Sequence, residues 1–274
     1  MPDPTIPAES LRPFLIELLQ AHSLFEYDAE IVADAVLYAH EVGNADDGLA
    51  HLPGWIALIG EGQIDPRGRP LVIAESPALQ TFDGSAAMGP IGLTHAVRWA
   101  IETAPRTGVA LAVVKNGRDA GCLSYYTKTI VDAGLVGLCQ TAGYRTAREA
   151  SYANARLAAS MPQPVSLTGS QVDPAAGGDC PEAFAHPLVA LAVLLSNGRT
   201  PVHRQSAPNP HQCEHLVLVV DPAHGIGADT VGRCIGREYK AEAPEEAETT
   251  ISLDATLRDH LAHLASGHDL ALPW

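Results

Sequence analysis

The sequence predicts an α/β protein with a largely parallel or mixed sheet, for two reasons. First, apolar runs typical of buried strands alternate with segments of helical periodicity; the runs are VALAVV (109–114), LVGLCQT (135–141) and HLVLVVDP (215–222). Second, the chain has 274 residues, 46% hydrophobic and 18% charged, which is enough to bury a full core. We therefore expect a single α/β protein over residues 1–274.

The N-terminal part of the sequence predicts three helices. Apolar residues at helical spacing run from Leu11 to His22, with Ser10 as a candidate N-cap. Asp28 is a candidate cap for a second helix, which Gly43 ends. A third, short helix is expected over Leu52–Ile59.

The central part alternates between strands and helices. LVIAES (71–76) is a strand candidate, and TFDGSAAMGP (81–90) is a glycine-containing loop that leads into a helix over Ile91–Thr103. A further helix is expected over Cys122–Ala133. The segment 143–180 has no sustained period, so we expect a loop with short elements there.

Order returns in the C-terminal part. Helices are predicted over HPLVALAVLLSNG (186–198), near Asp229–Arg237, and over 252–267, where Ser252 or Asp254 is the cap. The chain can therefore divide into two lobes, with the N-terminal helices (1–65) and the C-terminal helix (252–267) packing on a sheet-containing core (70–240).

Composition excludes several classes of partner. With 32 acidic and 17 basic residues, the formal charge of −15 would repel a phosphate backbone, so we expect no nucleic acid partner. No apolar run approaches the roughly 20 residues that span a bilayer, and the N-terminus lacks the features of a signal peptide. The five cysteines form no C-x-x-C pair, which favours reduced structural thiols. We therefore expect a cytoplasmic protein without a membrane partner.

Several segments occur in the order and spacing of a known family. They are DDGLAHLPGWIALIGEGQI (46–64), FDGSAAMG (82–89), GVALAVVKNGRDAGCLSYY (108–126) and DAGLVGL (132–138). In these segments the chain resembles the type-2 malate/L-lactate dehydrogenase family, which includes ureidoglycolate and sulfolactate dehydrogenases and cyclic imino acid reductases. The resemblance covers residues 10–140 well, and the segments 186–198 and 215–222 are similar to the family's C-terminal part.

The resemblance implies a mixed-sheet fold of that family, which is not a Rossmann fold. No G-x-G-x-x-G occurs in the chain, and the nearest approach, GIGADT from Gly225, lacks the third glycine. The resemblance also implies an NAD(P)-dependent oxidoreductase of small 2-oxo or 2-imino acids, with an active site near the two-fold interface of a homodimer. We expect a small-molecule substrate and a homodimer on this basis.

The chain departs from the family at its working residues. The family's His-Gly-x-x-Arg motif binds the substrate carboxylate, and the matching segment here reads Asp47-Gly48-Leu49-Ala50-His51. Asp119 stands where the family has its catalytic histidine. The family's cofactor loops are reduced to NARLAASMP (154–162) and SLTGS (166–170), and QVDPAAGGDC (171–180) replaces a lysine-containing segment. No residue can therefore be assigned to cofactor binding, and we expect that no cofactor binds. If the chain is still an oxidoreductase, the alternative expectation is that NAD(P) is its cofactor.

Asp47, His51 and Asp119 are the candidate catalytic residues, because the resemblance places all three in the substrate pocket. We expect Asp119 to be the principal general acid/base, His51 its partner, and Asp47 the residue that orients His51 or the substrate. Arg118, Tyr125 and Trp55 are candidate substrate-binding residues. Alternatively, the three titratable residues bind a divalent metal, or they are solvated loop residues of a dead site.

A second candidate metal site lies at the start of the strand 215–222. His211, Cys213 and His215 alternate there, which would place them on one face of a strand. A structural role at a loop-to-strand junction is the favoured interpretation, so no bound metal is expected.

Three functions follow from these observations. The chain is an enzyme that has abandoned the cofactor and uses acid–base chemistry for an elimination, cyclisation, isomerisation or hydrolysis; or it is an NAD(P)H-dependent oxidoreductase; or it is a non-catalytic ligand-binding protein. The residue replacements favour the first, and binding of reduced nicotinamide cofactors separates the second from the other two.

Overall fold

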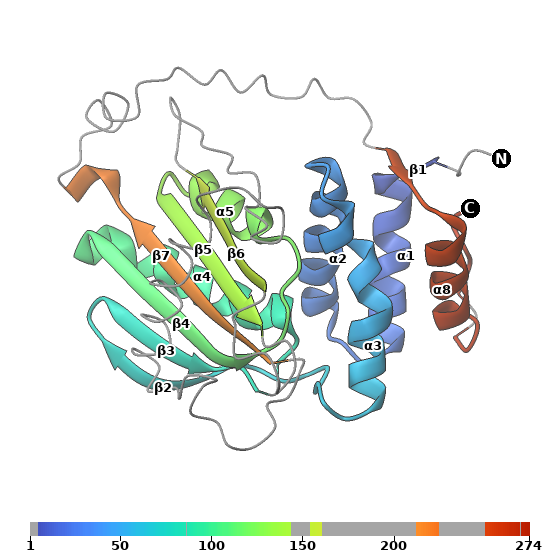
Figure 1. The fold of residues 1–274 in the computed structure, drawn as a ribbon, viewed down its shortest axis with the longest axis horizontal. Helices are drawn as coiled ribbons and strands as arrows, with labels where there is room; N and C mark the ends of the chain where they lie inside the picture. Colours follow the sequence, from blue (N-terminus) through green and yellow to red (C-terminus); the bar gives the residue numbers. More distant parts are fainter. Residues whose placement is uncertain (1–4, 86, 144–153, 161–211, 225–249, 269) are drawn as a thin grey trace.

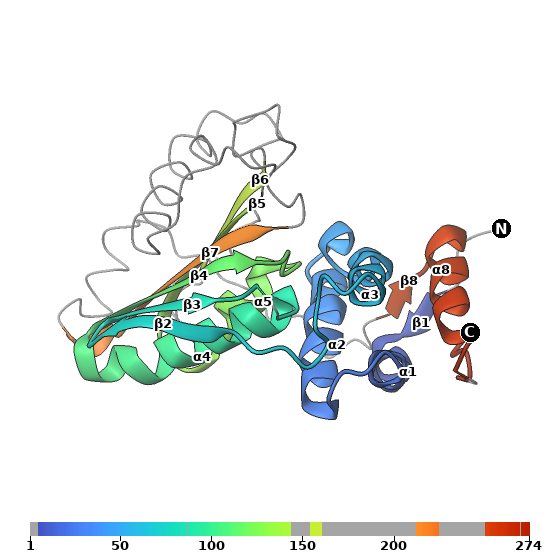
Figure 2. The ribbon, with the colours of Figure 1, turned by 90° about the horizontal axis from the view of Figure 1, so that it is seen from below.

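The computed structural model describes residues 5–85, 87–143, 154–160, 212–224, 250–268 and 270–274 (Figure 1). Within these residues a layer of helices lies beside a six-stranded sheet (Figures 1 and 2). The helical layer contains α1 (Ala8–Ala21), α2 (Glu26–Glu41), α3 (Leu52–Gly60) and α8 (Ala255–Ala265). Figure 1 shows α4 (Gly89–Thr107) and α5 (Leu123–Asp132) behind the sheet. None of the described helices combines the length and the hydropathy needed to cross a membrane.

The sheet is mixed, as predicted. Its strands follow the order β2-β3-β4-β7-β5-β6, with bounds Leu71–Ser76, Leu79–Asp83, Val109–Gly117, Cys213–Val220, Val136–Gly143 and Asn154–Ser160. Strands β3 and β4 pair in parallel, whereas the other pairs of neighbouring strands are antiparallel. The helix α4 forms the crossover between the parallel strands, which is the connection that parallel pairing requires.

The buried strands and their helices form one hydrophobic cluster. The cluster contains fully buried residues of β4 and β7, namely Ala110, Ala112, Val114, Val217 and Val219. They belong to the same cluster as Leu93, Val97, Leu123 and Ile130 of α4 and α5. A second cluster joins α1, α2 and α3 to Ile251, Leu253 and Leu261 near the C-terminal helix. Met88 and Ile91, at the start of α4, belong to this second cluster, so the N-terminus of α4 connects the helical layer with the sheet.

Two predicted helix caps are wrong. α1 begins at Ala8 with Pro7 as its N-cap, so Ser10 lies inside the first turn. α2 begins at Glu26 with Phe25 as its N-cap, and Asp28 is buried within that helix, where its carboxylate lies 2.6 Å from the guanidinium of Arg69. A capping residue and a residue that forms a buried ion pair look alike in sequence. The predicted end of α2 is confirmed, because the helix stops just before Gly43, whose φ is +74°.

The sequence predicted some of the other elements correctly and missed others. The predicted strand 71–76 and the helix from Leu52 are confirmed, but Leu79–Asp83 is a strand where the sequence predicted a loop beginning at Thr81. Its residues Gln80 and Thr81 are buried although they are polar. The strand therefore lacks the apolar run by which a buried strand is recognised in a sequence. The strand β6 falls in the segment predicted to be mainly loop, whereas the helices predicted at 186–198 and 229–237 lie outside the described residues.

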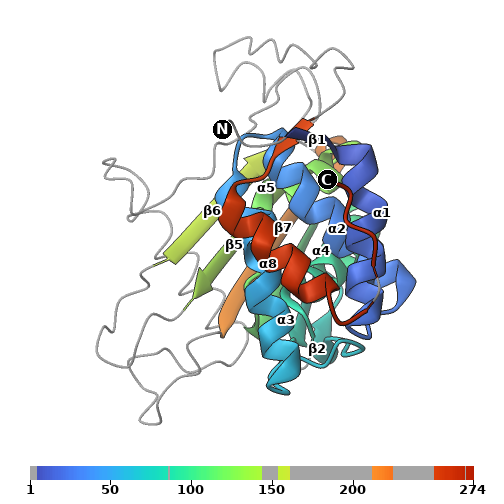
Figure 3. The ribbon, with the colours of Figure 1, turned by 90° about the vertical axis from the view of Figure 1, so that its right-hand side faces the viewer.

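Segments far apart in the sequence join at the helical layer. The strand β1 (Thr5–Pro7) pairs antiparallel with β8 (Thr250–Ser252), directly before α8 (Figure 3). Asp254 then caps α8, since its side chain accepts a hydrogen bond of 2.8 Å from the backbone N–H of Leu257. Of the two caps that the sequence allowed, the structure therefore selects Asp254.

This choice predicts different outcomes for two similar substitutions. Asp254→Ala removes the acceptor for an otherwise unpaired helix N–H and should lower the free energy of unfolding by about 1 kcal/mol. Ser252→Ala, the control, changes an exposed strand residue and should alter it by less than about 0.5 kcal/mol. Urea denaturation of both variants measures the difference, and equal effects would contradict the assigned cap.

Candidate functional site

The predicted catalytic pair Asp47 and His51 lies on two short turns between α2 and α3. These turns are the 3-10 helices η1 (Ala45–Asp47) and η2 (Leu49–His51). The backbone N–H of Leu49 donates a hydrogen bond of 3.4 Å to Nε2 of His40 in α2. Burial lowers the pKa of His40, which favours the neutral imidazole that can accept this bond. α2 therefore fixes the turn that carries the pair.

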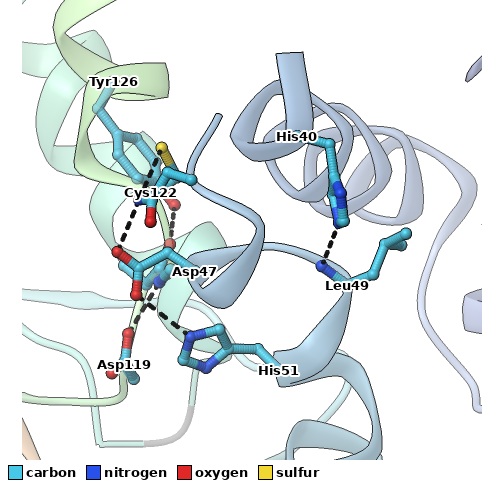
Figure 4. A network of polar contacts seen from close by, with 10 residues as sticks. His40, Asp47, Leu49, His51, Asp119, Cys122 and Tyr126 are labelled. Atoms are coloured by element: carbon cyan, nitrogen blue, oxygen red, sulfur yellow. Dashed lines mark hydrogen bonds and ion pairs between the residues drawn. The ribbon is translucent and has the colours of Figure 1, made fainter. Parts of the chain in front are cut away.

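The side chains of the pair contact each other. Nε2 of His51 lies 3.5 Å from Oδ1 of Asp47, and the Asn44 amide donates a 2.9 Å hydrogen bond to the other carboxylate oxygen (Figure 4). The indole of Trp55, one turn along in α3, stacks on the imidazole with a centroid distance of 5.3 Å and an interplanar angle of 24°. The carboxylate and the indole together fix the orientation of the His51 ring.

Asp119 reaches the same region from the sheet. It lies in the loop after β4, and its Oδ1 accepts a 2.8 Å hydrogen bond from the backbone N–H of Gly121. Gly121 has a φ of +68°, and a Cβ there would lie 2.9 Å from the backbone oxygen of Asp47. This contact holds the Asp119 loop against the turn that carries Asp47 and His51. Figure 4 shows the side chains of Asp47, His51 and Asp119 in the same region.

A second close approach supports the Asp119 loop from α4. At Gly89, the first residue of α4, a Cβ would lie 1.8 Å from the backbone oxygen of Asp119, so only glycine fits there. Behind the loop, the hydroxyl of buried Tyr126 donates a 2.7 Å hydrogen bond to the Ala120 carbonyl. Burial raises the pKa of Tyr126 well above its usual value, which keeps this donor protonated.

Arg118 is buried beside Asp119, and its guanidinium bonds to backbone. Nη1 donates to the carbonyls of Asn116 and Gly117 at 3.2 Å each, and Nη2 donates to the Gln63 carbonyl at 2.9 Å. Burial also lowers the pKa of Arg118. These three hydrogen bonds connect the end of β4 to the segment after α3.

Tyr125 lies at the junction between α5 and α2. Its ring is 6.0 Å from that of Tyr38 and 5.3 Å from that of Tyr126. Burial raises the pKa of the Tyr125 hydroxyl. Of the predicted substrate-binding residues, Trp55 thus contacts the catalytic candidate His51 directly. Arg118 bonds to backbone carbonyls, and Tyr125 packs against other tyrosines.

His215 has a role that the sequence did not indicate. Its Nε2 lies 2.9 Å from the backbone oxygen of Arg118, which can only accept, so Nε2 carries the proton and Nδ1 accepts from the Thr141 hydroxyl at 2.6 Å. Both ring nitrogens of this buried side chain therefore bond to protein. The sequence holds no signal for this role, because the pairing of His215 with Val114 in the register of β7 and β4 appears only in the structure.

Neither metal alternative gains support from the described residues. His211 lies outside them, Cys213 is buried, and His215 has both nitrogens engaged. Within the parts of the chain that the structure describes, no three histidine, cysteine, aspartate or glutamate side chains are placed to hold a metal ion, and this includes Asp47, His51 and Asp119.

A hollow of about 480 Å³ lies away from these residues. It is bordered by the β2–β3 hairpin and the C-terminal half of α4, with lining residues Glu75, Ser76, Pro77, Gln80, Trp99, Thr103, Arg106 and Thr107. None of the predicted site residues lines it. We place the candidate site at the cluster of titratable residues, because chemistry requires the reactive groups and not merely space.

Comparisons with known proteins agree in sequence and in fold. The sequence model described as malate/L-lactate dehydrogenase matches residues 6–160. The malate dehydrogenase of Pyrococcus abyssi is 30% identical over 136 residues, which are 50% of this chain and 38% of that protein. The delta(1)-pyrroline-2-carboxylate reductase of Pseudomonas fluorescens is 26% identical over 122 residues, 44% of this chain and 36% of that protein. These matches thus span well under half the length of the relatives.

Solved structures of several dehydrogenases share this fold. The malate dehydrogenase of Entamoeba histolytica superposes with a TM-score of 0.75 at 16% identity, covering 99% of this chain and 100% of that chain. The sulfolactate dehydrogenase of Methanocaldococcus jannaschii superposes with a TM-score of 0.71 at 16% identity, covering 96% and 97%. Because the matched family model spans more than half of the 274 residues, the chain belongs to the type-2 malate/L-lactate dehydrogenase family.

Proposed function

We propose that this chain is an oxidoreductase that acts on a small hydroxy or imino acid and moves a proton through Asp119, His51 and Asp47. The observation that carries the proposal is the contact of Asp47 with His51, stacked on Trp55 and joined to the Asp119 loop at Gly121. The substrate class comes from the relatives, whose names specify malate, sulfolactate and pyrroline-2-carboxylate.

The three residues have distinct proposed roles. Asp119 is the principal general acid/base, because it reaches the cluster from the carboxyl end of β4, where ligand sites gather in α/β sheets. His51 is its partner, and Asp47 orients the His51 ring through the 3.5 Å contact. Reduction of a carbonyl or imine needs one proton with each hydride, and this cluster would supply that proton.

NAD(P) is the cofactor that family membership favours, in contrast to the sequence-based expectation that none binds. The cofactor would supply the hydride. Of the segments that resemble the family's cofactor site, the structure describes only the backbone of β6. No residue is therefore assigned to cofactor binding, and the proposed proton transfer does not depend on such a residue.

A second candidate function is acid–base chemistry without a cofactor: an elimination, cyclisation, isomerisation or hydrolysis. The observation that favours it is the charge of the cluster, which contains two carboxylates and one imidazole, while the nearby Arg118 donates to three backbone carbonyls. Such a site suits proton transfer on a neutral or cationic substrate better than binding of a carboxylate.

Titration with NADH and NADPH separates the two candidates. We expect one of the two to bind saturably at sub-millimolar concentration with one site per chain, because the family's members are named as dehydrogenases and reductases. Calorimetry measures the stoichiometry directly. If neither binds, the oxidoreductase proposal fails, and the cofactor-independent reaction and the non-catalytic ligand-binding function remain.

Asp119→Asn tests the proposed acid/base. The asparagine Oδ1 can still accept the hydrogen bond from Gly121, so the loop and the melting temperature should change little. Loss of the titratable group should lower turnover about 100- to 10,000-fold. Turnover is followed by NAD(P)H absorbance with a panel of 2-oxo and cyclic 2-imino acids.

The matched control is Asp46→Asn, which makes the same change at an exposed position beside Asp47 and should leave turnover within about two-fold of wild type. Wild-type turnover by Asp119→Asn would refute the assignment. If wild type also turns over none of the panel, while binding the compounds, the protein is a ligand-binding protein instead.

We also propose that the chain forms a homodimer, as two-fold assemblies are the commonest closed oligomers. Light scattering at micromolar concentration should return twice the 28.8 kDa mass of one chain. A monomer mass would contradict this. A cytoplasmic location stays a proposal of the same kind, since it depends on the sequence alone.

A further inference from the structure

His215 lies in the interior of the sheet, next to strands on both sides. Its strand β7 runs between β4 and β5 (Figure 1). His215 is opposite Thr141 of β5 and opposite Val114 of β4. The side chain is 1% exposed, and the residues two and four positions along the strand, Val217 and Val219, belong to the cluster that includes α4 and α5. A polar ring is thus buried in line with apolar side chains, where an unpaired nitrogen would be costly.

The end of β4 is irregular where it passes His215. The pairing of β4 with β7 shifts between Val114 and Gly117, which is the pattern of a bulge. Within this irregular stretch Asn116 has a φ of +56°, a left-handed conformation that is uncommon for residues other than glycine. At Gly117 a Cβ would lie 2.8 Å from Nε2 of His215, so the absence of a side chain lets the ring approach the backbone. The next carbonyl, that of Arg118, lies 2.9 Å from Nε2.

The Arg118 carbonyl belongs to the peptide unit that joins Arg118 to Asp119. Because a peptide unit is planar, the direction of this carbonyl also sets the direction of the Asp119 N–H. His215 donates to this oxygen, and Gly89 of α4 approaches it so closely that a Cβ would lie 2.6 Å away. The backbone that leads into Asp119 is thus fixed, just as the N–H of Gly121 fixes the Asp119 carboxylate through its 2.8 Å hydrogen bond.

Thr141 determines which nitrogen of His215 donates. A neutral imidazole has one donor and one acceptor nitrogen, and the hydrogen bonds around the ring select between the two forms. The Thr141 hydroxyl lies 2.6 Å from Nδ1 and donates to it, which leaves the proton on Nε2, where the Arg118 carbonyl accepts it. Thr141 is 1% exposed, like His215, so water does not compete for these bonds.

We propose that His215 and Thr141 are positioning residues for Asp119. Thr141 holds His215 in the Nε2–H form, and His215 holds the peptide unit that leads into Asp119. Both act through the Arg118 carbonyl and not on the substrate. The proposal rests on the general acid/base role proposed above for Asp119, and it assigns the residues that aim the carboxylate. Such residues matter because a misplacement of about 1 Å in a reacting group can cost about 100-fold in rate.

Thr141→Val tests this role, and Thr127→Val is its matched control. Both threonines are buried, but the Thr127 hydroxyl donates to the Ser124 carbonyl within α5. Thr141→Val should lower kcat about ten-fold and leave KM within about two-fold, because it displaces the reacting carboxylate and leaves other substrate contacts in place. Thr127→Val should keep both constants within about two-fold of wild type. Thr141→Ser retains the hydroxyl and should restore kcat to the same range.

A double substitution separates positioning from a general effect on the fold. If Thr141 acts through Asp119, Thr141→Val should cost less than about two-fold in turnover once Asp119→Asn has removed the carboxylate. An equal loss in both backgrounds would overturn the proposal. His215→Leu removes the donor itself and should show the same dependence on Asp119, with a loss of about 10- to 100-fold when the carboxylate is present. Should His215→Leu fail to fold, the Thr141 variants decide.

Hydrogen exchange tests the same link without an activity. The Gly121 amide should exchange about ten-fold faster in Thr141→Val than in Thr127→Val, because displacement of the Asp119 carboxylate weakens the bond that this amide donates. Equal exchange in the two variants would overturn the positioning role, whatever the reaction is. A wild type that turns over none of the substrate panel, together with faster exchange in Thr141→Val, would refute the proposed function and leave the positioning of the loop standing.

Discussion

Direct contact between backbones at two glycines determines where the candidate site lies. Gly121 lies against the carbonyl of Asp47, and Gly89 lies against the carbonyl of Asp119. These contacts join three segments that are distant in sequence: the turn after α2, the start of α4 and the loop after β4. A side chain at either glycine would push the segments apart. The short distance between the sheet and the helical layer therefore requires glycine at both positions.

The loop between these contacts is held by buried polar groups. Its carbonyls at Arg118 and Ala120 accept hydrogen bonds from His215 and Tyr126, and the Arg118 guanidinium bonds back to the segment after α3. Each donor comes from a different element, namely β7, α5 and the loop itself. A functional side chain on such a loop is held nearly as firmly as one on a strand, which suits a group that must meet a substrate in a fixed geometry.

Sequence reasoning found much of the fold because apolar periodicity reflects burial directly. It placed the strand 71–76 and the start of α3 correctly, and it chose Asp47 and His51, which the structure places in contact. It failed where a residue's role depends on distant neighbours. Asp28 looked like a helix cap because the sequence does not show that Arg69 lies beside it. The role of His215 was missed because its bonds to Thr141 and Arg118 span 74 and 97 residues. The catalytic roles themselves stay predictions.

The pairing of β1 with β8 has a consequence for the order in which the protein folds during synthesis. Residues 5–7 leave the ribosome well before their partners at 250–252 are made. The helices α1, α2 and α3 share their hydrophobic cluster with Ile251, Leu253 and Leu261, so part of their apolar surface stays uncovered until these later residues are made. The sheet strands before residue 160 can pair much sooner. The nascent chain would therefore expose the uncovered side of α1 to chaperones until residues 250–261 emerge.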